Sequence, residues 1–357
     1  MKDSVKMEEL KREIDARVAA YFASAEIHMG VALSPVSDRA LQLLAEFTMR
    51  PSKRLRGILA VVAYEMFGGN SHDAALDLAL AMELAQSYLL IIDDVMDRSL
   101  TRRGGPTIHT EYVAALHTDF PNRNAAHEAN MAAVIMGELA QHLASAVLNT
   151  VDAPAERVLT AERLFHINLA ATGHGQLDDL FSSVGYAQNI EETVAMYVRK
   201  TCHYTFINPL QTGAALAGAS SDDIEALKTF GIYAGIAFQL QDDDIGMFGK
   251  TETSGKSNLD DLREGKLTVL MRHALAHASG SDLPTLQRAL GNKRVTQRQH
   301  HAVQGILEQI GSREYTQQEM QQANTGAVAV LTMQKHWDET SKLFLRSVLV
   351  SLTNRTN

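Results

Sequence analysis

The sequence has little of what builds disulfide-linked or β-rich proteins. Among its 357 residues there is one cysteine, Cys202, so no disulfide framework exists, as is usual in a reducing compartment. Only seven prolines occur, far apart, which leaves room for long helices. Short alternating runs of valine, isoleucine and threonine, typical of strands, are nearly absent. These absences favour an all-α protein.

Positive charge is also scarce. The formal net charge is −9, which argues against a general role in nucleic-acid binding. The N-terminal stretch MKDSVKMEELKREIDARVAA has the charge pattern of an amphipathic helix and not that of a signal peptide. We expect no apolar run to be both long enough and free enough of charge to span a bilayer. The sequence therefore predicts a cytoplasmic protein without a membrane anchor.

What the sequence does contain is a succession of helical patterns rich in alanine and leucine. Turn-forming stretches such as GGNSHD (68–73) and RRGGP (102–106) separate them, and no linker is visible, so we predict one domain over residues 1–357. The predicted helices are 4–28, 37–49, 54–67, 72–98, 107–118, 124–149, 155–182, 189–219 (interrupted near Pro209), 222–248, 266–278, 283–291, 296–311, 313–334 and 337–352.

An acidic cluster ends one of these helices. Apolar residues recur every three or four positions along it and predict a buried stripe: Leu78, Met82, Ala85, Leu89, Ile92 and Met96. Asp93 and Asp97 lie one helical turn apart on one face, next to Asp94. Like charges at this spacing destabilise a helix, so we expect a cation to lie on them. A calcium loop of the EF-hand type is excluded, because Val95 stands where such a loop needs a ligand.

A second acidic cluster follows some 150 residues later, in FQLQDDDIGMFGKTETSGKSNLDDLREGKLT (238–268). Asp242, Asp243 and Asp244 again end an apolar helix, and Lys256 and Lys266 follow. Two such clusters suggest facing helices that share hard cations such as Mg²⁺, which prefers oxygen ligands and often bridges to phosphates. The stretch GKTETSGKS is not a phosphate-binding P-loop, because five residues separate its glycines where four are required.

Two further stretches add basic residues. RPSKRLRG (50–57) offers Lys53, Arg54 and Arg56, and RKTCHYTF (199–206) offers Lys200 and Thr201. Any one of these stretches is typical of solvated surface charge. Together with the cations after each acidic cluster, they predict a site for a polyanion.

Taken together, these motifs resemble those of the trans-isoprenyl diphosphate synthases, the polyprenyl synthetase family, and in particular farnesyl and geranylgeranyl diphosphate synthases. The resemblance runs from about residue 45 to 270 through SKRLR, DDVMD with LTRRGGPT, GQLDDL, KTCHYTF, FQLQDDDIGMFG and DLREGKLT, in that order. It implies a bundle of roughly 12–14 helices around a central cavity, the isoprenoid synthase fold, usually as a homodimer. The implied activity is Mg²⁺-dependent condensation of isopentenyl diphosphate with an allylic diphosphate.

The resemblance also implies roles for individual residues. About three Mg²⁺ ions would be held by Asp93, Asp97 and Asp242, supported by Asp94 and Asp243. The allylic diphosphate would be bound by Arg102, Lys200, Lys256 and Lys266. Isopentenyl diphosphate would be bound by Lys53, Arg56, Gln86 and Arg103. Thr201 and Gln239 would line the carbocation, and Gln176 and Asp179 would face the cavity.

Three positions depart from the family pattern. Gly246 stands where many members have a third aspartate, Pro51-Ser52 replaces a glycine pair, and the C-terminal TNRTN has one arginine, Arg355.

Product length is expected to depend on the residues before the first acidic cluster. The resemblance implies a short product, because in the family an aromatic residue such as Tyr88, five positions before Asp93, goes with short products. Leu89 stands where many farnesyl enzymes have a second aromatic residue, which favours geranylgeranyl over farnesyl diphosphate. Two alternatives stay open from the sequence: a class I terpene cyclase, which shares the fold and the first acidic motif, and a non-catalytic subunit of a heteromeric synthase.

Overall fold

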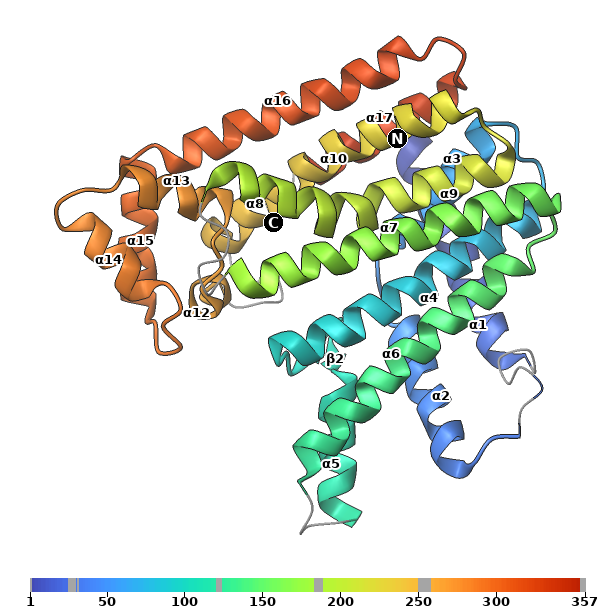
Figure 1. Cartoon of the computed structure of the whole chain (residues 1–357), viewed down its shortest axis with the longest axis horizontal. Helices are drawn as coiled ribbons and strands as arrows, with labels where there is room; N and C mark the ends of the chain where they lie inside the picture. Colours follow the sequence, from blue (N-terminus) through green and yellow to red (C-terminus); the bar gives the residue numbers. More distant parts are fainter. Residues whose placement is uncertain are drawn as a thin grey trace. The chain divides into compact units, whose positions relative to one another are not determined.

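The computed structural model describes residues 2–24, 30, 32–119, 124–182, 189–249 and 258–353, and it is almost entirely helical there (Figure 1). The helices are α1 (Lys2–Ala23), α2 (Pro35–Met49), α3 (Leu55–Met66), α4 (His72–Asp97), α5 (Ile108–Asp119), α6 (Ala125–Asn149), α7 (Ala155–Ser182), α8 (Ile190–Tyr197), η2 (Val198–Ile207), α9 (Asn208–Ala217), α10 (Ser221–Phe248), α12 (Asp260–Glu264), α13 (Val269–His277), α14 (Asp282–Ala289), α15 (Gln297–Gln309), α16 (Ser312–Met333) and α17 (Glu339–Thr353). In the described residues the only strands are β1 (Thr101–Arg102) and β2 (Gly105–Pro106), which form one antiparallel hairpin. The all-α prediction is confirmed.

Hydroxyl and amide side chains fix where many helices begin. The N-cap side chains of Ser34, Ser71, Ser220 and Thr268 each accept a hydrogen bond from a backbone N–H in the first turn of α2, α4, α10 and α13. Each such cap satisfies a donor that the helix cannot satisfy itself, and contributes about 1 kcal/mol. The predicted starts therefore lie within a few residues of the observed ones.

The chain forms two compact units. Unit 1 comprises residues 1–163 and 212–219, and unit 2 comprises 164–211 and 220–357. Unit 1 is organised around α4, on which α1, α3 and α6 pack. The predicted stripe of α4 is buried at Leu78, Met82 and Ala85, but Met96 near the helix end is 43% exposed. Burial thus decreases toward the acidic end of α4, which frees its last turn for polar contacts.

An ion cluster in unit 1 has two buried members, Arg54 and Glu83, and one partly exposed member, Asp15. The guanidinium of Arg54 donates to Asp15 (Nε to Oδ1, 2.6 Å) and to Glu83 (Nη1 to Oε2, 2.9 Å). Arg54 has a left-handed backbone (φ +49°), and it directly precedes α3. Burial opposes its charge, yet the two carboxylates outweigh that effect and raise the pKa of Arg54. Arg54 therefore joins α1, α3 and α4, while its neighbour Lys53 is exposed.

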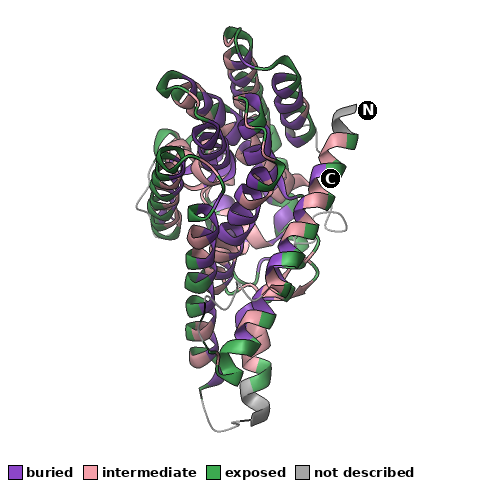
Figure 2. Ribbon diagram, turned by 90° about the vertical axis from the view of Figure 1, so that its right-hand side faces the viewer, coloured by how far each residue is buried: buried purple, intermediate pink, exposed green. Residues whose placement is uncertain are grey.

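Unit 2 is organised around α10, which packs on η2, α8, α13, α16 and α17. Figure 2 shows how burial alternates along the helices of the chain, as expected for amphipathic helices that each bury one face. Phe206 of η2 and Phe230 of α10 are fully buried. A β-carbon on Gly235 of α10 would lie 2.5 Å from the Cys202 sulfur, so α10 and η2 approach closely only because that side chain is absent.

The interruption predicted near Pro209 is present as a change of helix type, from η2 to α9 at Asn208, and a second change, at Val198, was not predicted. The α-helical pattern changes at Val198, where α8 passes into the ten-residue π-helix η2, and α9 begins at Asn208. The N–H of Asn208 donates to the carbonyl of His203, five residues back. This wider turn accommodates Pro209, whose ring and missing N–H would disrupt a regular α-helix.

Two further expectations need correction. The segment predicted as helix 266–278 begins at Val269, because Thr268 caps α13, and the short helix α12 before it was missed. Two described helices, α4 and α6, are by length and hydropathy sufficient to span a membrane, contrary to the prediction. Two thirds of the apolar window of α4 is buried within the protein, as in the core helix of a globular unit. In α6 the buried share is 44%, and it leaves an exposed apolar face.

Candidate functional site

The first acidic cluster lies at the C-terminal end of α4 in unit 1. Helix α4 ends at Arg98, which has a left-handed backbone (φ +55°), and the N–H of Ser99 donates to the carbonyl of Asp94 (2.9 Å). This turn directs the chain back past the helix, so that the hairpin β1–β2 follows at once. The carboxylates of α4 and the arginines of the hairpin are therefore neighbours.

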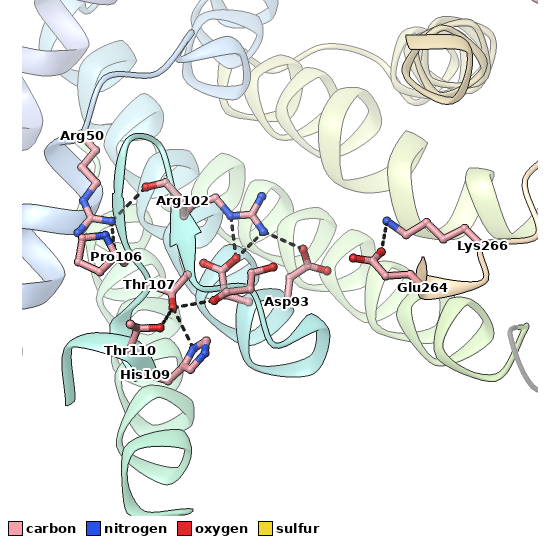
Figure 3. A network of polar contacts seen from close by, with 11 residues as sticks. Arg50, Asp93, Arg102, Pro106, Thr107, His109, Thr110, Glu264 and Lys266 are labelled. Carbon is pink, nitrogen blue, oxygen red and sulfur yellow. Dashed lines mark hydrogen bonds and ion pairs between the residues drawn. The ribbon is translucent and has the colours of Figure 1, made fainter. Parts of the chain in front are cut away.

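Arg102 on the hairpin pairs with this cluster (Figure 3). Its Nε donates to Asp94 Oδ1 (2.7 Å), its Nη2 donates to the same carboxylate, and Nη2 lies 3.5 Å from Asp93 Oδ2. Burial opposes the charge of Arg102, but Asp94, Asp93 and Asp97 together raise its pKa. Asp94 is buried and Asp93 is half-buried, so Asp94 holds the arginine while Asp93 remains accessible.

A tight turn carries the second arginine. Arg103 and Gly104, the two residues between the paired positions Arg102 and Gly105, both have positive φ (+51° and +76°). Such turns match the twist of a two-residue hairpin. For Arg103, which has a β-carbon, the left-handed conformation costs about 1 kcal/mol. Strain of this size often marks a functional segment.

The remaining predicted residues of unit 1 differ in exposure. Lys53 is exposed, Gln86 is buried, and the half-buried ones are Arg56, Tyr88, Leu89, Asp97 and Arg103. Burial and the nearby charge of Glu138 raise the pKa of Tyr88, which places Glu138 of α6 near that hydroxyl. A β-carbon on Gly137 would lie 3.0 Å from Ile92 Cδ1, so α6 packs closely on α4 beside Tyr88.

In unit 2, three predicted residues form one chain of hydrogen bonds. Thr201 Oγ1 donates to Gln239 Oε1 (2.6 Å), and Gln239 Nε2 donates to Asp243 Oδ1 (2.9 Å). The Tyr197 hydroxyl donates to the other Asp243 oxygen and accepts from the N–H of Val269 (3.1 Å). Both Asp243 oxygens are thus occupied by neighbours in α8 and α10.

The carboxyl group of Asp243 is electrostatically unusual. Burial, and to a smaller extent the charges of Asp261 and Asp242, raise its pKa to about 7, against the hydrogen bonds from Tyr197 and Gln239. Carboxyl groups with a pKa raised in this way are typical of functional clusters.

Lys200 and Lys266 lie beside this chain. A cavity of about 80 Å³ is lined by Asp179, Ser182, Met196, Tyr197, Lys200, Thr201, Gln239, Asp243, Lys266, Leu267 and Thr268. The Lys200 ammonium donates to Asp179, and the Lys266 ammonium pairs with Glu264 (2.8 Å) and Asp261 (3.4 Å). Six of the residues predicted from the sequence, Asp179 among them, therefore converge in unit 2. Gln176, in contrast, is half-buried on α7 and is not among the residues that line this cavity.

An acidic pocket of about 340 Å³ adjoins them. It is lined by Gln239, Asp242, Asp243, Ile245, Gly246, Asn258, Asp260, Asp261, Glu264 and Lys266. A β-carbon on Gly246 would lie 2.2 Å from Asp261 Oδ2, so the Asp261 carboxylate occupies the space beside the position of the family's third aspartate. Asp244 points elsewhere and pairs with Arg313 (Nε to Oδ1, 2.9 Å), whose guanidinium lies over the ring of Phe248.

The donor chemistry of both clusters fits Mg²⁺. The side chains are carboxylates, the hard oxygen ligands that this ion prefers, and unit 2 gathers five of them in one pocket. Within the described ranges, no three carboxylate, histidine or cysteine side chains converge closely enough to hold an ion as they stand. Several of the carboxylates instead contact Arg102, Lys200 or Lys266.

Sequence reasoning missed some members of these clusters. Asp260, Asp261 and Glu264 were present in the quoted stretch SNLDDLREGKLT, where only the basic residues were assigned roles. Tyr197 had no local signal, because its partner Asp243 is 46 residues away. The predicted Lys256 and the C-terminal Arg355 lie outside the described residues.

Comparison with known proteins gives a consistent result. A sequence model of the polyprenyl synthetase family matches residues 37–309. Geranylgeranyl diphosphate synthase of Sulfolobus acidocaldarius is 30% identical over 243 residues, which are 68% of this chain and 68% of that protein. (2E,6E)-farnesyl diphosphate synthase of Mycobacterium bovis is 31% identical over 229 residues, 64% of this chain and 58% of that protein.

A solved structure is similar over nearly the whole chain. The crystal structure of geranylgeranyl pyrophosphate synthase from Corynebacterium glutamicum, complexed with isoprenyl diphosphate and magnesium, superposes with a TM-score of 0.90 at 27% identity. The match covers 98% of this chain and 99% of that one.

Proposed function

The chain belongs to the polyprenyl synthetase family, and from this premise we propose that it is a short-chain trans-prenyltransferase. It condenses isopentenyl diphosphate with an allylic diphosphate and releases inorganic diphosphate. The observation that carries the proposal is the chain Thr201–Gln239–Asp243 beside Lys200 and Lys266, which sets cations, carboxylates and neutral polar groups around one cavity.

The reaction breaks the bond between the allylic carbon and its diphosphate oxygen. The electron pair leaves with the diphosphate, and the double bond of isopentenyl diphosphate attacks the allylic cation. Loss of a proton, which the departing diphosphate can accept, restores a double bond. These reaction steps need no nucleophilic side chain. This agrees with the amino-acid sequence, in which we assigned no Ser/His or Cys/His pair.

Cationic side chains stabilise the negative charge that develops on the leaving group. We assign Arg102, Lys200 and Lys266, with Lys256, to the allylic diphosphate, and Lys53, Arg56, Gln86 and Arg103 to isopentenyl diphosphate. Preorganised cations in a site of low water content stabilise such charge more strongly than water does. In the described structure Arg102, Lys200 and Lys266 are already held by Asp94, Asp179 and Glu264, so they are oriented before a substrate binds.

Thr201 and Gln239 have a different role. Their hydrogen bond presents neutral dipoles to the position assigned to the cation. A cation next to such groups is stabilised without being captured.

Carboxylates would hold about three Mg²⁺ ions. We assign this role to Asp93, Asp97 and Asp242, with Asp94 and Asp243 in support. Bound Mg²⁺ supplies Lewis acidity at the diphosphate oxygens. Asp94 pairs with Arg102, and Asp243 accepts hydrogen bonds from Tyr197 and Gln239. These contacts favour an indirect role for Asp94 and Asp243, in which they assist the carboxylates that bind Mg²⁺.

Product length is assigned to the residues that precede Asp93 on α4. Tyr88 and Leu89 lie one turn or more before the acidic end and are half-buried. We propose geranylgeranyl diphosphate as the main product, with farnesyl diphosphate as the competing one.

The enzyme is proposed to act as a homodimer in the cytoplasm. Helix α6 carries four exposed apolar side chains on one stripe, Met131, Val134, Ile135 and Leu139. A stripe of this kind supports association through α6, because isolated proteins rarely leave such a surface in water.

A single incubation tests the function. Purified protein is mixed with Mg²⁺, labelled isopentenyl diphosphate and each allylic primer, and the products are separated by chain length. Elongation is expected; a cyclised hydrocarbon would indicate a terpene cyclase, and absence of turnover a non-catalytic subunit.

A matched pair of variants on α10 tests the acidic cluster. Asp242→Asn should lower kcat/KM about 100-fold, since it removes a proposed Mg²⁺ ligand. The control Asp222→Asn alters an exposed aspartate of the same helix and should leave activity unchanged.

A further inference from the structure

Arg50, which directly follows α2 and caps it, contacts both strands of the hairpin β1–β2. Its Nη1 donates to the carbonyl of Pro106 (2.7 Å) on β2 and to the carbonyl of Arg102 (3.2 Å) on β1 (Figure 3). One guanidinium therefore bridges two strands that begin about 50 residues later in the sequence.

The guanidinium is also fixed by its packing. A β-carbon on Gly105 would lie 2.7 Å from Arg50 Cζ and 2.9 Å from Nη2, so the guanidinium lies directly against this glycine. The ring of Phe47, one turn earlier in α2, lies 5.3 Å from Cζ, a distance typical of a cation–π contact. Arg50 is half-buried and is thereby held in one place.

The hairpin needs such support. A two-stranded hairpin is marginally stable by itself, and this one has two paired positions and a left-handed, non-glycine residue, Arg103, in its turn. Its base is closed by Thr107, whose Oγ1 donates to the carbonyl of Ser99 (2.8 Å) and whose N–H donates to the carbonyl of Leu100 (3.0 Å). Arg50 supplies a second attachment, at the strands themselves.

We propose that Arg50 is a positioning residue for diphosphate binding, a role that rests on the function proposed above. It lies three residues before Lys53 and clamps the hairpin that carries Arg102 and Arg103. It thus fixes the distance between two segments whose cations bind diphosphate, without contacting the substrate itself. No sequence motif indicated this, because the contact joins a helix end to main-chain carbonyls.

The test begins with substitutions at Arg50. Arg50→Met removes the donors and keeps a long side chain, whereas Arg50→Lys keeps a charged donor but loses the planar group against Gly105. We expect Arg50→Met to raise KM for isopentenyl diphosphate about tenfold, because small misplacements of binding groups cost this much or more. Arg50→Lys should lie between Arg50→Met and the unmodified protein. The matched control is Arg39→Met, which alters an exposed arginine of α2, the helix that Arg50 caps.

Gly105→Ala provides an independent perturbation of the same contact. Gly105 is not one of the positive-φ positions, so alanine acts there by its volume, displacing the guanidinium. If both changes act through one contact, Gly105→Ala should raise KM for isopentenyl diphosphate in the parent protein. In the Arg50→Met background the same change should raise that KM by less than about twofold.

Two measurements separate positioning from a loss of folded protein. A fall in the folded fraction lowers apparent kcat and the thermal midpoint and leaves KM unchanged. An unchanged KM in Arg50→Met, with or without a lower kcat and thermal midpoint, would overturn the proposal. Calorimetric titration with inorganic diphosphate and Mg²⁺ supplies a readout that does not require turnover, and Arg50→Met should bind about tenfold more weakly. If the unmodified protein elongates no primer while this binding difference persists, the proposed reaction fails and the role of Arg50 stands. Equal diphosphate affinities would refute the role of Arg50 whatever the activity.

Discussion

Tyr197→Phe removes a single hydroxyl group from the interior of unit 2. That hydroxyl donates to Asp243 and accepts from the N–H of Val269, the first residue of α13. Tyr197 is 3% exposed, so the variant removes the protein partner of both groups in the interior of the unit. The substitution therefore tests whether this hydroxyl joins α8, α10 and α13.

The expected cost follows from the two lost contacts. A hydrogen bond to a charged group contributes about 1.5–3 kcal/mol, and a buried N–H left without a partner costs about 1–3 kcal/mol. Because Asp243 has a pKa of about 7 and is only partly ionised at neutral pH, the lower part of the first range applies. We expect Tyr197→Phe to lower the free energy of unfolding by about 3 kcal/mol.

The assay is urea unfolding followed by circular dichroism at 222 nm. The control is Tyr233→Phe, which removes a hydroxyl from an exposed tyrosine of α10 and should change the unfolding free energy by less than about 0.5 kcal/mol. Both variants should keep the dependence of stability on urea concentration unchanged. Equal urea midpoints for the two variants would refute the reasoning. The buried hydroxyl of Tyr197 would then stabilise the protein no more than the exposed hydroxyl of Tyr233 does.

Three further outcomes are expected. Gly246→Asp, which restores the aspartate of many family members, should lower Mg²⁺-dependent activity, because its β-carbon would lie 2.2 Å from the Asp261 carboxylate; a gain in activity would contradict this. Tyr88→Ala should lengthen the product in a chain-length assay with a farnesyl primer, and an unchanged product would exclude Tyr88 as the limit. Burial opposes the charge of Asp223, but its hydrogen bonds, including one from Trp337 (2.7 Å), lower its pKa. The stability advantage over Asp223→Asn should therefore be about 2 kcal/mol at pH 7 and decline below about pH 4, in unfolding experiments at both pH values; a pH-independent difference would exclude this ionic contribution.

The helices could be predicted from the sequence because local signals determine them. The stripe from Leu78 to Ala85 indicated α4, and the turn-forming stretch GGNSHD (68–73) marked where the helix begins; in the structure Ser71 of that stretch caps α4. The change of helix type at Val198 could not be predicted, because residues 190–207 contain no glycine or proline that would signal it. Pro209 was a valid local signal, and the wider π-type turn before it accommodates the proline ring and the missing N–H.

The candidate site was predictable to the extent that residue types recur in motifs. Thr201, Gln239 and Asp243 were named from the sequence and are joined by hydrogen bonds. Arg50 was not named from the sequence, because its partners are main-chain carbonyls, which leave no mark in the residue types. Asp244 was grouped with its neighbours, yet one step along a helix turns its side chain by about 100° toward Arg313. Adjacent carboxylates in the sequence thus reach different partners.

The glycines of α10 have a consequence for related sequences. Gly235 lies against Cys202, and a β-carbon on Gly231 would lie 2.7 Å from Ile207 Cγ1. In each pair, the side chain of the η2 residue fills the space between the helices, and the α10 residue is a glycine without a side chain. Across an alignment of relatives that keep η2, positions 202 and 235 should therefore covary in size, and so should 207 and 231, with a larger residue in one column matched by a smaller one in the other.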